Sequence, residues 1–339
     1  MKRSLAAAVY LSCHALVAGF TNPIKTYNGS DPQMVYYDGM YYLTSTSWTD
    51  VEITSAATIE GLKTATPQVI YTDNTTERSA NWWAPELWQI DGTWYIYFTA
   101  GVKDSSWDVM LRTLNVWVLK GGIETPTSDP YTLVGELRPS NDAHGMLDGT
   151  TYVINDKRYF FYSSVNNTDN PIGATLWVAE LTSPTTIGES TMIAYPEYDW
   201  ETTPSAVIEG PAGITSPDGT VYIAYSANTC NGPEYALGAL RLAKDADPLS
   251  TSSWTKLAEP ILTTNTTAGE YGPGHNGFFK SPDGTQDWIV FHANRDENGS
   301  CDAYRQTFVQ QVTWSNNAPV LQPLIEPGVE ITEPSTDLD

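Results

Sequence analysis

The chain has 339 residues and a formal net charge of −23, with 40 Asp and Glu against 17 Lys and Arg. This charge excludes nucleic-acid binding by phosphate neutralisation and disfavours docking on anionic lipid. Hydrophobic residues make up 41% of the chain and charged residues 17%, which excludes bulk disorder. Twelve Trp and 20 Tyr against 8 Phe, with 25 Gly and 22 Pro, favour short strands joined by tight turns. We therefore expect an all-β protein.

The amino terminus is typical of a secretory signal. Met1-Lys2-Arg3 supplies a basic start, and the mostly apolar run from Leu5 to Ala18 is followed by the small residue Gly19. This run is shorter than the roughly 20 residues that span a bilayer. The alternative is a buried first helix. We predict that residues 1–19 are a signal peptide and that the mature protein is secreted, extracellular and free of membrane partners.

Export would leave two cysteines, Cys230 and Cys301, in the mature chain. Two cysteines in an oxidising compartment tend to pair, so we predict a disulfide between them. Two buried free thiols are the alternative. Five Asn-X-Ser/Thr sequons further indicate a glycoprotein; they stand at Asn28, Asn74, Asn166, Asn265 and Asn298.

One pattern recurs five times along the chain: a strand, a tight turn with Asp, Asn or Gly, and an aromatic strand that ends in small residues. The turn aspartates stand at 38, 91, 156, 218 and 283, with spacings of 53, 65, 62 and 65 residues. The predicted hairpins cover residues 33–45, 86–100, 150–163, 212–227 and 276–293. An Asx-Gly turn between two strand-like runs is a strong hairpin signal.

Repeats of this length that each open with a hairpin predict a five-bladed β-propeller, which we place at residues 20–325. Third and fourth strands are expected at residues 109–118, 176–181, 236–242 and 308–314. The alternative is a β-sandwich with unrelated hairpins. Residues 326–339 are predicted to be a short, acidic, loosely ordered tail.

An ionisable residue stands at the start of each predicted first strand; these are Asp31, Glu86, Asp148, Glu209 and His275. First strands line the channel of a propeller and start on one face, so these side chains are expected at one channel mouth. Converging carboxyls repel each other, and their pKa values must separate, which suits one acid and one base. The alternative is a set of carboxylates that holds a structural cation.

The same face carries candidate sugar-binding groups. Trp83 and Trp107 lie in segments expected at this face, although a Trp is more often part of a core. Arg305 begins a predicted third strand and can donate several hydrogen bonds; its alternative is a surface ion pair. The sequence has no Gly-x-Ser-x-Gly elbow, phosphate-binding glycine loop or His-Glu-x-x-His motif, which disfavours those hydrolytic and nucleotide chemistries.

Six motifs in order resemble glycoside hydrolase family 43 over nearly the whole mature chain. They are Ser30-Asp31-Pro32, Trp83-Ala84-Pro85-Glu86, Leu147-Asp148-Gly149-Thr150, Glu209-Gly210-Pro211, Gly272-Pro273-Gly274-His275-Asn276 and Tyr304-Arg305-Gln306-Thr307. Each motif alone is weak, but the ordered set is specific.

The resemblance implies a role for each matching residue. Asp31 would be the general base that activates water, Glu209 the general acid, and Asp148 the residue that orients the acid and raises its pKa. His275 would organise calcium or another ion through water in the channel, and Arg305 would contact sugar hydroxyls together with Trp83, Trp107, His275 and Glu86. The family inverts configuration, which requires carboxyls about 6.5–9.5 Å apart.

Within this family the chain is most similar to exo-acting α-1,5-L-arabinofuranosidases, on the Gly272–Asn276 stretch and the loop from His292 to Cys301. Four long loops, at residues 48–50, 102–108, 228–234 and 294–303, favour a pocket over an open cleft. The resemblance therefore implies a monomer that releases terminal arabinose from a neutral arabinan or arabino-oligosaccharide. The alternatives are an endo-arabinanase or β-xylosidase with the same triad, and a non-catalytic sugar-binding propeller.

Overall fold

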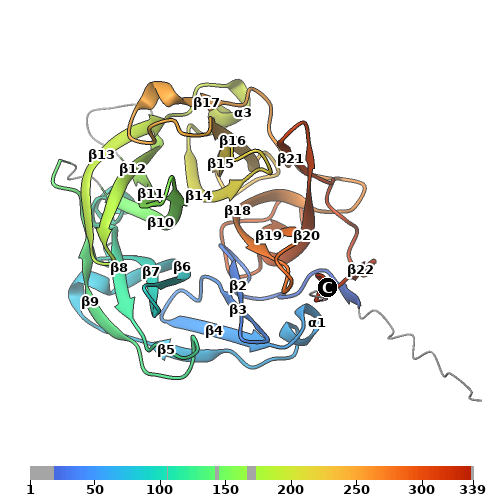
Figure 1. The fold of residues 1–339 in the computed structure, drawn as a ribbon, viewed down its shortest axis with the longest axis horizontal. Coiled ribbons are helices and arrows are strands. Elements are labelled where there is room, and N and C mark those ends of the chain that lie inside the picture. The colour runs from blue at the N-terminus through green and yellow to red at the C-terminus, as the bar shows by residue number, and fades with distance from the viewer. Residues whose placement is uncertain (1–18, 105, 142–144, 166–172, 337–339) are drawn as a thin grey trace, which may run out of the picture.

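The computed structural model describes residues 19–104, 106–141, 145–165 and 173–336. Five four-stranded antiparallel sheets surround a central axis as the blades of a propeller (Figure 1). In each blade the strands follow chain order, from the first strand at the axis to the fourth at the periphery. The prediction of a five-bladed β-propeller is confirmed.

The strands of each blade have the following bounds. Blade one contains β2 (Gln33–Tyr37), β3 (Met40–Thr44), β4 (Val51–Ala56) and β5 (Gln68–Tyr71). Blade two contains β6 (Ala80–Ile90), β7 (Thr93–Gly101), β8 (Asn115–Lys120) and β9 (Thr132–Leu137). Blade three contains β10 (Gly145–Ile154), β11 (Lys157–Val165), β12 (Ala174–Ser183) and β13 (Thr186–Ala194). Blade four contains β14 (Ile208–Thr215), β15 (Val221–Ala227), β16 (Ala236–Leu242) and β17 (Trp254–Lys256). Blade five contains β18 (Tyr271–Lys280), β19 (Asp287–Asn294), β20 (Gln306–Ser315) and β21 (Ala318–Leu321).

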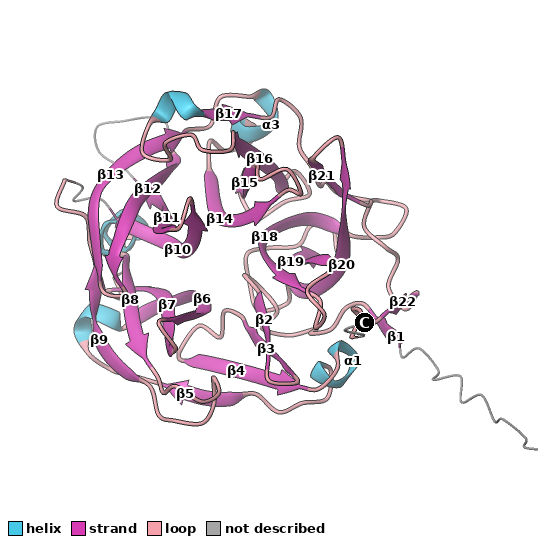
Figure 2. Cartoon of the chain, viewed as in Figure 1, coloured by secondary structure: helices cyan, strands magenta, loops and turns pink. Residues whose placement is uncertain are grey.

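Helices are short and lie outside the sheets (Figure 2). They are α1 (Ile59–Leu62), α2 (Trp107–Thr113), α3 (Asp199–Thr202) and the 3-10 turns η1 (Thr76–Arg78) and η2 (Thr251–Ser253). No helix in the described part of the chain is long and apolar enough to cross a membrane.

All five predicted hairpins are present, but their turns are of two kinds. In blades one and two both turn residues have positive φ, as in Asp38 (47°) and Gly39 (78°), which is the backbone that a two-residue I′ turn requires. Blades four and five instead use Ser-Pro-Asp-Gly loops, in which Gly219 and Gly284 have positive φ. Glycine adopts this backbone without a Cβ penalty.

One predicted third strand is partly wrong. Residues 107–113 of the second blade form α2, and the third strand β8 begins at Asn115 rather than at Val109. The Ser106 hydroxyl accepts a hydrogen bond from the Val109 N–H as an N-cap, and Arg112 pairs with Asp108 one turn earlier at 2.6 Å. These local interactions favour a helix where the apolar run alone indicated a strand.

The carboxy-terminal segment is not a loose tail over its described residues. Strand β22 (Glu330–Thr332) pairs antiparallel with β1 (Gly19–Thr21), and the Glu333 carboxylate accepts hydrogen bonds from the Ile59 and Glu60 N–H groups. The two ends of the described chain are therefore joined beside blade one. Residues 1–18 of the predicted signal peptide lie outside the described residues.

The core lies between neighbouring blades and is rich in aromatic rings. Tyr97, Phe160 and Tyr162 are fully buried between blades two and three. The Tyr97 hydroxyl donates to the Pro184 carbonyl at 2.8 Å, which satisfies its polar end. The abundance of Tyr over Phe therefore serves the sheet interfaces as well as the surface.

The sequons differ in accessibility. Asn74 and Asn298 are exposed, whereas Asn28 is half-buried. The Asn265 amide donates to the Leu324 carbonyl at 2.9 Å, so a glycan there would break this contact. Asn166 lies outside the described residues. Glycosylation stays a prediction, and Asn74 and Asn298 are the sequons best placed for it.

Candidate active site

Each blade has a residue with a left-handed backbone near the channel mouth, within the inner strand or, for Asp31, just before it. These residues are Asp31 (φ 54°), Ala84 (44°), Asp148 (56°), Gly210 (61°) and His275 (41°). In blades two to five they coincide with register shifts, as expected for bulges that redirect side chains. The sequence analysis placed an ionisable residue at the start of each inner strand. Asp31, Asp148 and His275 hold the left-handed position itself, whereas blades two and four have Ala84 and Gly210 there. Glu209 stands directly before Gly210, and Glu86 stands two residues after Ala84.

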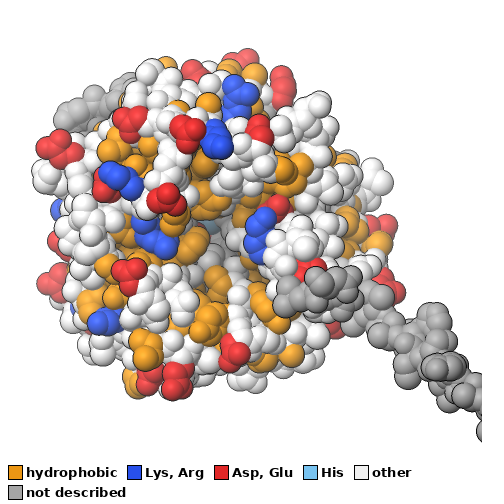
Figure 3. Space-filling view, in the orientation of Figure 1, with side chains coloured by type: hydrophobic (Ala, Val, Ile, Leu, Met, Phe, Trp, Pro, Cys, Tyr) orange, Lys and Arg blue, Asp and Glu red, His pale blue; other side chains and the backbone are white. Residues whose placement is uncertain are grey.

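The inner strands surround a cavity of about 570 Å³ on the propeller face. Its lining includes the carboxyls Asp31, Asp148 and Glu209, together with Trp83, Trp107, His275 and Arg305 as predicted. The predicted triad is therefore brought together in one concave site. Figure 3 shows one face of the propeller, which is hollowed near its centre, with Lys and Arg side chains beside the depression and Asp and Glu side chains around it.

Asp31 is held in its charged form. Burial alone would raise its pKa, but Arg305 and His275 oppose this effect and leave the pKa well below its usual range. Arg305 Nη1 lies 3.2 Å and His275 Nδ1 3.3 Å from Asp31 Oδ1, while the Thr46 hydroxyl donates to Oδ2 at 2.6 Å. A carboxylate that is ionised at neutral pH suits the role of a base.

Glu209 and Asp148 behave in the opposite way. Burial raises the pKa of Glu209 to about 7, although the Tyr235 hydroxyl, which donates to Oε1 at 2.8 Å, partly offsets this. Burial and repulsion from Glu209 raise the pKa of Asp148, against a hydrogen bond from the Gly210 N–H. The pair therefore retains a proton near neutral pH. Together with ionised Asp31, it supplies an acid and a base in one cavity.

Comparison with known proteins now decides the family. Residues 20–319 match the model of glycosyl hydrolases family 43. The chain belongs to this family. It is 34% identical over 304 residues to the extracellular exo-alpha-(1->5)-L-arabinofuranosidase of Streptomyces avermitilis, covering 87% of this chain and 61% of that protein. It is 30% identical to the Streptomyces chartreusis enzyme of the same name, covering 82% of this chain and 83% of that one.

A solved structure has the same fold. The alpha-L-arabinofuranosidase of Lactobacillus brevis superposes with a TM-score of 0.84 at 30% identity, over 91% of this chain and 98% of that one. The chain spans 61% of the length of the Streptomyces avermitilis relative and 65% of alpha-L-arabinofuranosidase 43 of Humicola insolens. Both relatives therefore contain substantial sequence beyond the part that matches.

Glu86 does not reach the cavity of this family 43 chain. Its carboxyl accepts a hydrogen bond from Trp88 Nε1 at 2.8 Å, and burial raises its pKa to about 7. It is not among the residues that line the cavity. Glu86 therefore does not lie with the other residues that were predicted to bind sugar. It stands two residues after the bulge at Ala84.

Aromatic rings form one wall of the cavity. Trp107 begins α2 and is 58% exposed, and its ring centroid lies 6.3 Å from that of Trp83. Trp48 also lines the cavity. Trp82, by contrast, is buried and stacks on Phe98 in the core. The choice of Trp83 and Trp107 as cavity residues agrees with their positions.

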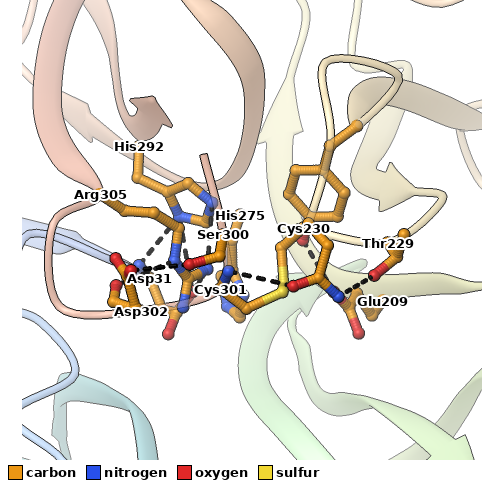
Figure 4. Close-up of a disulfide and its surroundings, with 12 residues drawn as sticks. Asp31, Glu209, Thr229, Cys230, His275, His292, Ser300, Cys301, Asp302 and Arg305 are labelled. Carbon is orange, nitrogen blue, oxygen red and sulfur yellow. Dashed lines mark hydrogen bonds and ion pairs between the residues drawn. A yellow bond between two sulfur atoms is a disulfide. The ribbon is translucent and has the colours of Figure 1, made fainter. Parts of the chain in front are cut away.

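The predicted disulfide is present between Cys230 and Cys301, whose Cα atoms are 5.1 Å apart. Cys230 follows β15 and Cys301 follows β19, so the bond joins the loops of blades four and five. Figure 4 shows the sulfur atoms between the group around Asp31 and the side chain of Glu209. Both cysteines line the cavity, so the bond fixes part of its wall.

Replacing both Cys230 and Cys301 by Ser is expected to lower the free energy of unfolding by about 4 kcal/mol. The bond closes a loop with a sequence separation of 71 residues, and the chain-entropy model assigns this amount to a loop of that length. Chemical denaturation of the wild type and the double variant, each with and without reductant, measures the difference. Equal stability of the two proteins without reductant would contradict the expectation.

The predicted channel ion stays a prediction. His275 Nδ1 faces Asp31 at 3.3 Å, so one ring nitrogen is already engaged. Within the described residues, no group of three or more His, Cys, Asp or Glu side chains is arranged to hold a metal. His275 is thus a single candidate ligand, and the proposed chemistry does not depend on an ion.

Several residues that contact the triad were not predicted, and Tyr235 and His292 are two of them. Tyr235 bonds to Glu209, and His292 accepts a hydrogen bond from the Asp31 N–H at Nδ1. His292 belonged to the loop used to place the chain within its family, which was the one available signal. No local pattern marked Tyr235, because its contact with Glu209 depends on how β14 and the loop before β16 meet in space.

Proposed function

We propose that the protein is a secreted, monomeric, inverting exo-α-1,5-L-arabinofuranosidase. The observation that carries this proposal is a cavity that gathers one ionised carboxylate and one proton-retaining carboxyl pair. Relatives at 30–34% identity bear the names of extracellular enzymes with this activity. The disulfide suits an oxidising, extracellular environment.

In the proposed reaction Asp31 removes a proton from a water molecule that attacks the anomeric carbon. Glu209, which keeps its proton near neutral pH, donates that proton to the departing glycosidic oxygen. Asp148 shares the pair's charge with Glu209 and orients it. Because water enters opposite the leaving group, the anomeric configuration inverts. Arg305, already 3.2 Å from Asp31, is placed to contact sugar hydroxyls beside the base.

Exo action is supported by the loops that surround the cavity. Four of the lining residues come from four different blades, each from the segment that follows the second strand. They are Trp48, Trp107 at the start of α2, Cys230 and Cys301. The disulfide joins two of these segments. A site walled on four sides accepts a chain end more readily than the middle of a polymer. The proposed substrate is therefore a neutral arabinan or arabino-oligosaccharide with a free terminal arabinofuranose.

Linear α-1,5-arabino-oligosaccharides are expected to shorten by one residue at a time, with arabinose as the only early product. Chromatography of early time points measures this, and proton NMR of fresh product should show the β-anomer first. Arabinoxylan and xylo-oligosaccharides serve as comparison substrates. Early release of dimers and trimers from long arabinan would indicate an endo enzyme. Release of xylose would indicate a xylosidase, and binding without cleavage would indicate a sugar-binding propeller.

A further inference from the structure

Each of the five residues with a left-handed backbone at the channel mouth is bonded through its N–H to a neighbouring blade. In each blade a side chain at the end of the second strand accepts the N–H of the left-handed residue in the next blade. The bonds are Ala84 N–H to Thr46 Oγ1 (2.8 Å), Asp148 N–H to Thr99 Oγ1 (3.0 Å), Gly210 N–H to Ser163 Oγ (3.2 Å), His275 N–H to Ser226 Oγ (2.6 Å) and Asp31 N–H to His292 Nδ1 (3.1 Å). Four acceptors are hydroxyls and the fifth is an imidazole.

The imidazole of His292 lies where the last blade of the propeller, blade five, meets blade one. His292 is fully buried, and its ring lies nearly parallel to that of Tyr235, with 5.7 Å between centroids and 8° between planes. Its Nε2 lies 3.2 Å from Arg305 Nη1, a contact that a Ser or Thr hydroxyl would be too short to make. His292 therefore contacts both Asp31 and the arginine that holds Asp31 ionised.

His292 stays neutral in this position. Burial and the nearby Arg305 lower its pKa well below the usual value, against the attraction of Asp31. A neutral imidazole has one acceptor nitrogen. With Nδ1 accepting the Asp31 N–H, Nε2 carries the proton, so its approach to Arg305 Nη1 is a packing contact and not a hydrogen bond. The hydrogen bond to Nδ1 fixes the residue whose positive φ directs the Asp31 carboxylate toward the cavity.

Tyr235 connects the same stack to the other carboxyl. It is 1% exposed, and its hydroxyl donates to Glu209 Oε1 at 2.8 Å. Neither Tyr235 nor His292 is among the residues that line the cavity. The stacked pair thus touches Asp31 on one side and Glu209 on the other from outside the site.

We propose that His292 and Tyr235 act as one positioning unit, which holds the base Asp31 and the acid Glu209 in a fixed mutual arrangement. This inference rests on the proposed function, because it assumes those two roles. Neither residue is a catalytic residue, since neither reaches the cavity. Misplacing a reacting group by about 1 Å can cost about 10²-fold in rate, which sets the scale of the expected effects.

Tyr235→Phe is expected to act mainly through the acid. It keeps the ring on His292 but removes the hydrogen bond to Glu209, which is otherwise faced by Asp31, Asp148 and Arg305. It also removes the contact of the hydroxyl with Ser226, whose own hydroxyl still accepts the His275 N–H. Because the phenol stabilises the carboxylate, its loss should move the alkaline limb of the pH–rate profile upward from about 7. We expect kcat on arabinotriose to fall about tenfold, with little change on 4-nitrophenyl arabinofuranoside. Equal losses on both substrates with an unmoved alkaline limb would overturn the role of Tyr235.

His292→Leu and His292→Asn form a matched pair for the base. Leu removes the acceptor, and we expect kcat to fall about 10²-fold on both substrates. Asn restores an oxygen near the Nδ1 position and is expected to recover most of that loss. Circular dichroism and thermal unfolding establish that each variant is folded. If His292→Leu misfolds, two results still decide the inference: the activity of His292→Asn relative to the wild type, and the pH profile of Tyr235→Phe. The inference fails if His292→Asn is as inactive as His292→Leu. It also fails if folded His292→Leu retains full activity.

The proposed function and this inference fail in different ways. If Asp31→Asn and Glu209→Gln remain fully active, the assignment of base and acid is wrong and the inference falls with it. If those two variants lose activity while Tyr235→Phe and His292→Leu match the wild type on both substrates, the proposed function stands and the positioning unit alone is rejected.

Discussion

Asp31→Asn is expected to lose about 10²- to 10⁴-fold in kcat on every substrate, whatever the leaving group. The amide preserves the size of the side chain but cannot take a proton from water. Water must be activated for both an oligosaccharide and an aryl arabinofuranoside, so both reactions depend equally on this residue. Steady-state kinetics on arabinotriose and 4-nitrophenyl arabinofuranoside measure the two losses.

The variant also removes a buried charge that faces Arg305 and His275. Leaving a buried arginine without its partner costs about 3–5 kcal/mol, so thermal unfolding must accompany the kinetics. Asp38→Asn is the matched control, because Asp38 is an exposed turn residue with positive φ, a backbone that Asn tolerates. Unchanged turnover in folded Asp31→Asn would remove Asp31 from the mechanism.

The fold was predictable because its signals are local. The first two strands of each blade are joined by a tight turn such as Asp38-Gly39. The residues that favour this turn are neighbours in the sequence, so the hairpin can be predicted from a short stretch of chain. Regular spacing of those turns then gave the number of blades. The disulfide was predicted on different grounds, because export would leave only Cys230 and Cys301 in an oxidising compartment. The structure adds that each cysteine follows the second strand of its blade and that the two blades are adjacent.

The parts that were mispredicted depend on longer-range or finer geometry. Helix α2 is set by the Ser106 cap and the Asp108–Arg112 pair within an apolar stretch that also suits a strand. The carboxy-terminal strand β22 forms because it finds β1, which lies about 300 residues away in the sequence.

The triad was predicted, but the bulges that direct its side chains were not. Spacing from the turn cannot reveal a bulge, so Glu86 was grouped with Asp31 although Ala84 holds the equivalent position. His292 and Tyr235 were missed for a related reason. The contact of Tyr235 with Glu209 joins a loop to a strand, and no spacing within a repeat encodes it. His292 does stand at the repeated position that a Ser or Thr holds in the other blades, but its contact with Asp31 crosses from blade five to blade one.

Glu209→Gln should show a different pattern from the loss of the base. On arabino-oligosaccharides, whose leaving group is a sugar alkoxide that needs a proton, we expect kcat to fall by about 10²- to 10⁴-fold. On 2,4-dinitrophenyl arabinofuranoside, whose leaving group departs as a stable anion, most of the activity should remain. The ratio of the two losses measures how much the reaction depends on proton donation.

The pH–rate profile supplies an independent readout of the same variant. Glu209 must hold its proton to act as an acid, so wild-type activity on oligosaccharides should be full below the pKa of about 7 and decline above it. With the activated substrate, Glu209→Gln should lose that alkaline decline because Gln does not titrate. Glu189→Gln, an exposed position on β13, is the matched control and should keep the wild-type profile. Equal losses on both substrates, with the alkaline limb intact, would move the acid role to Asp148, the other carboxyl of the pair that retains the proton.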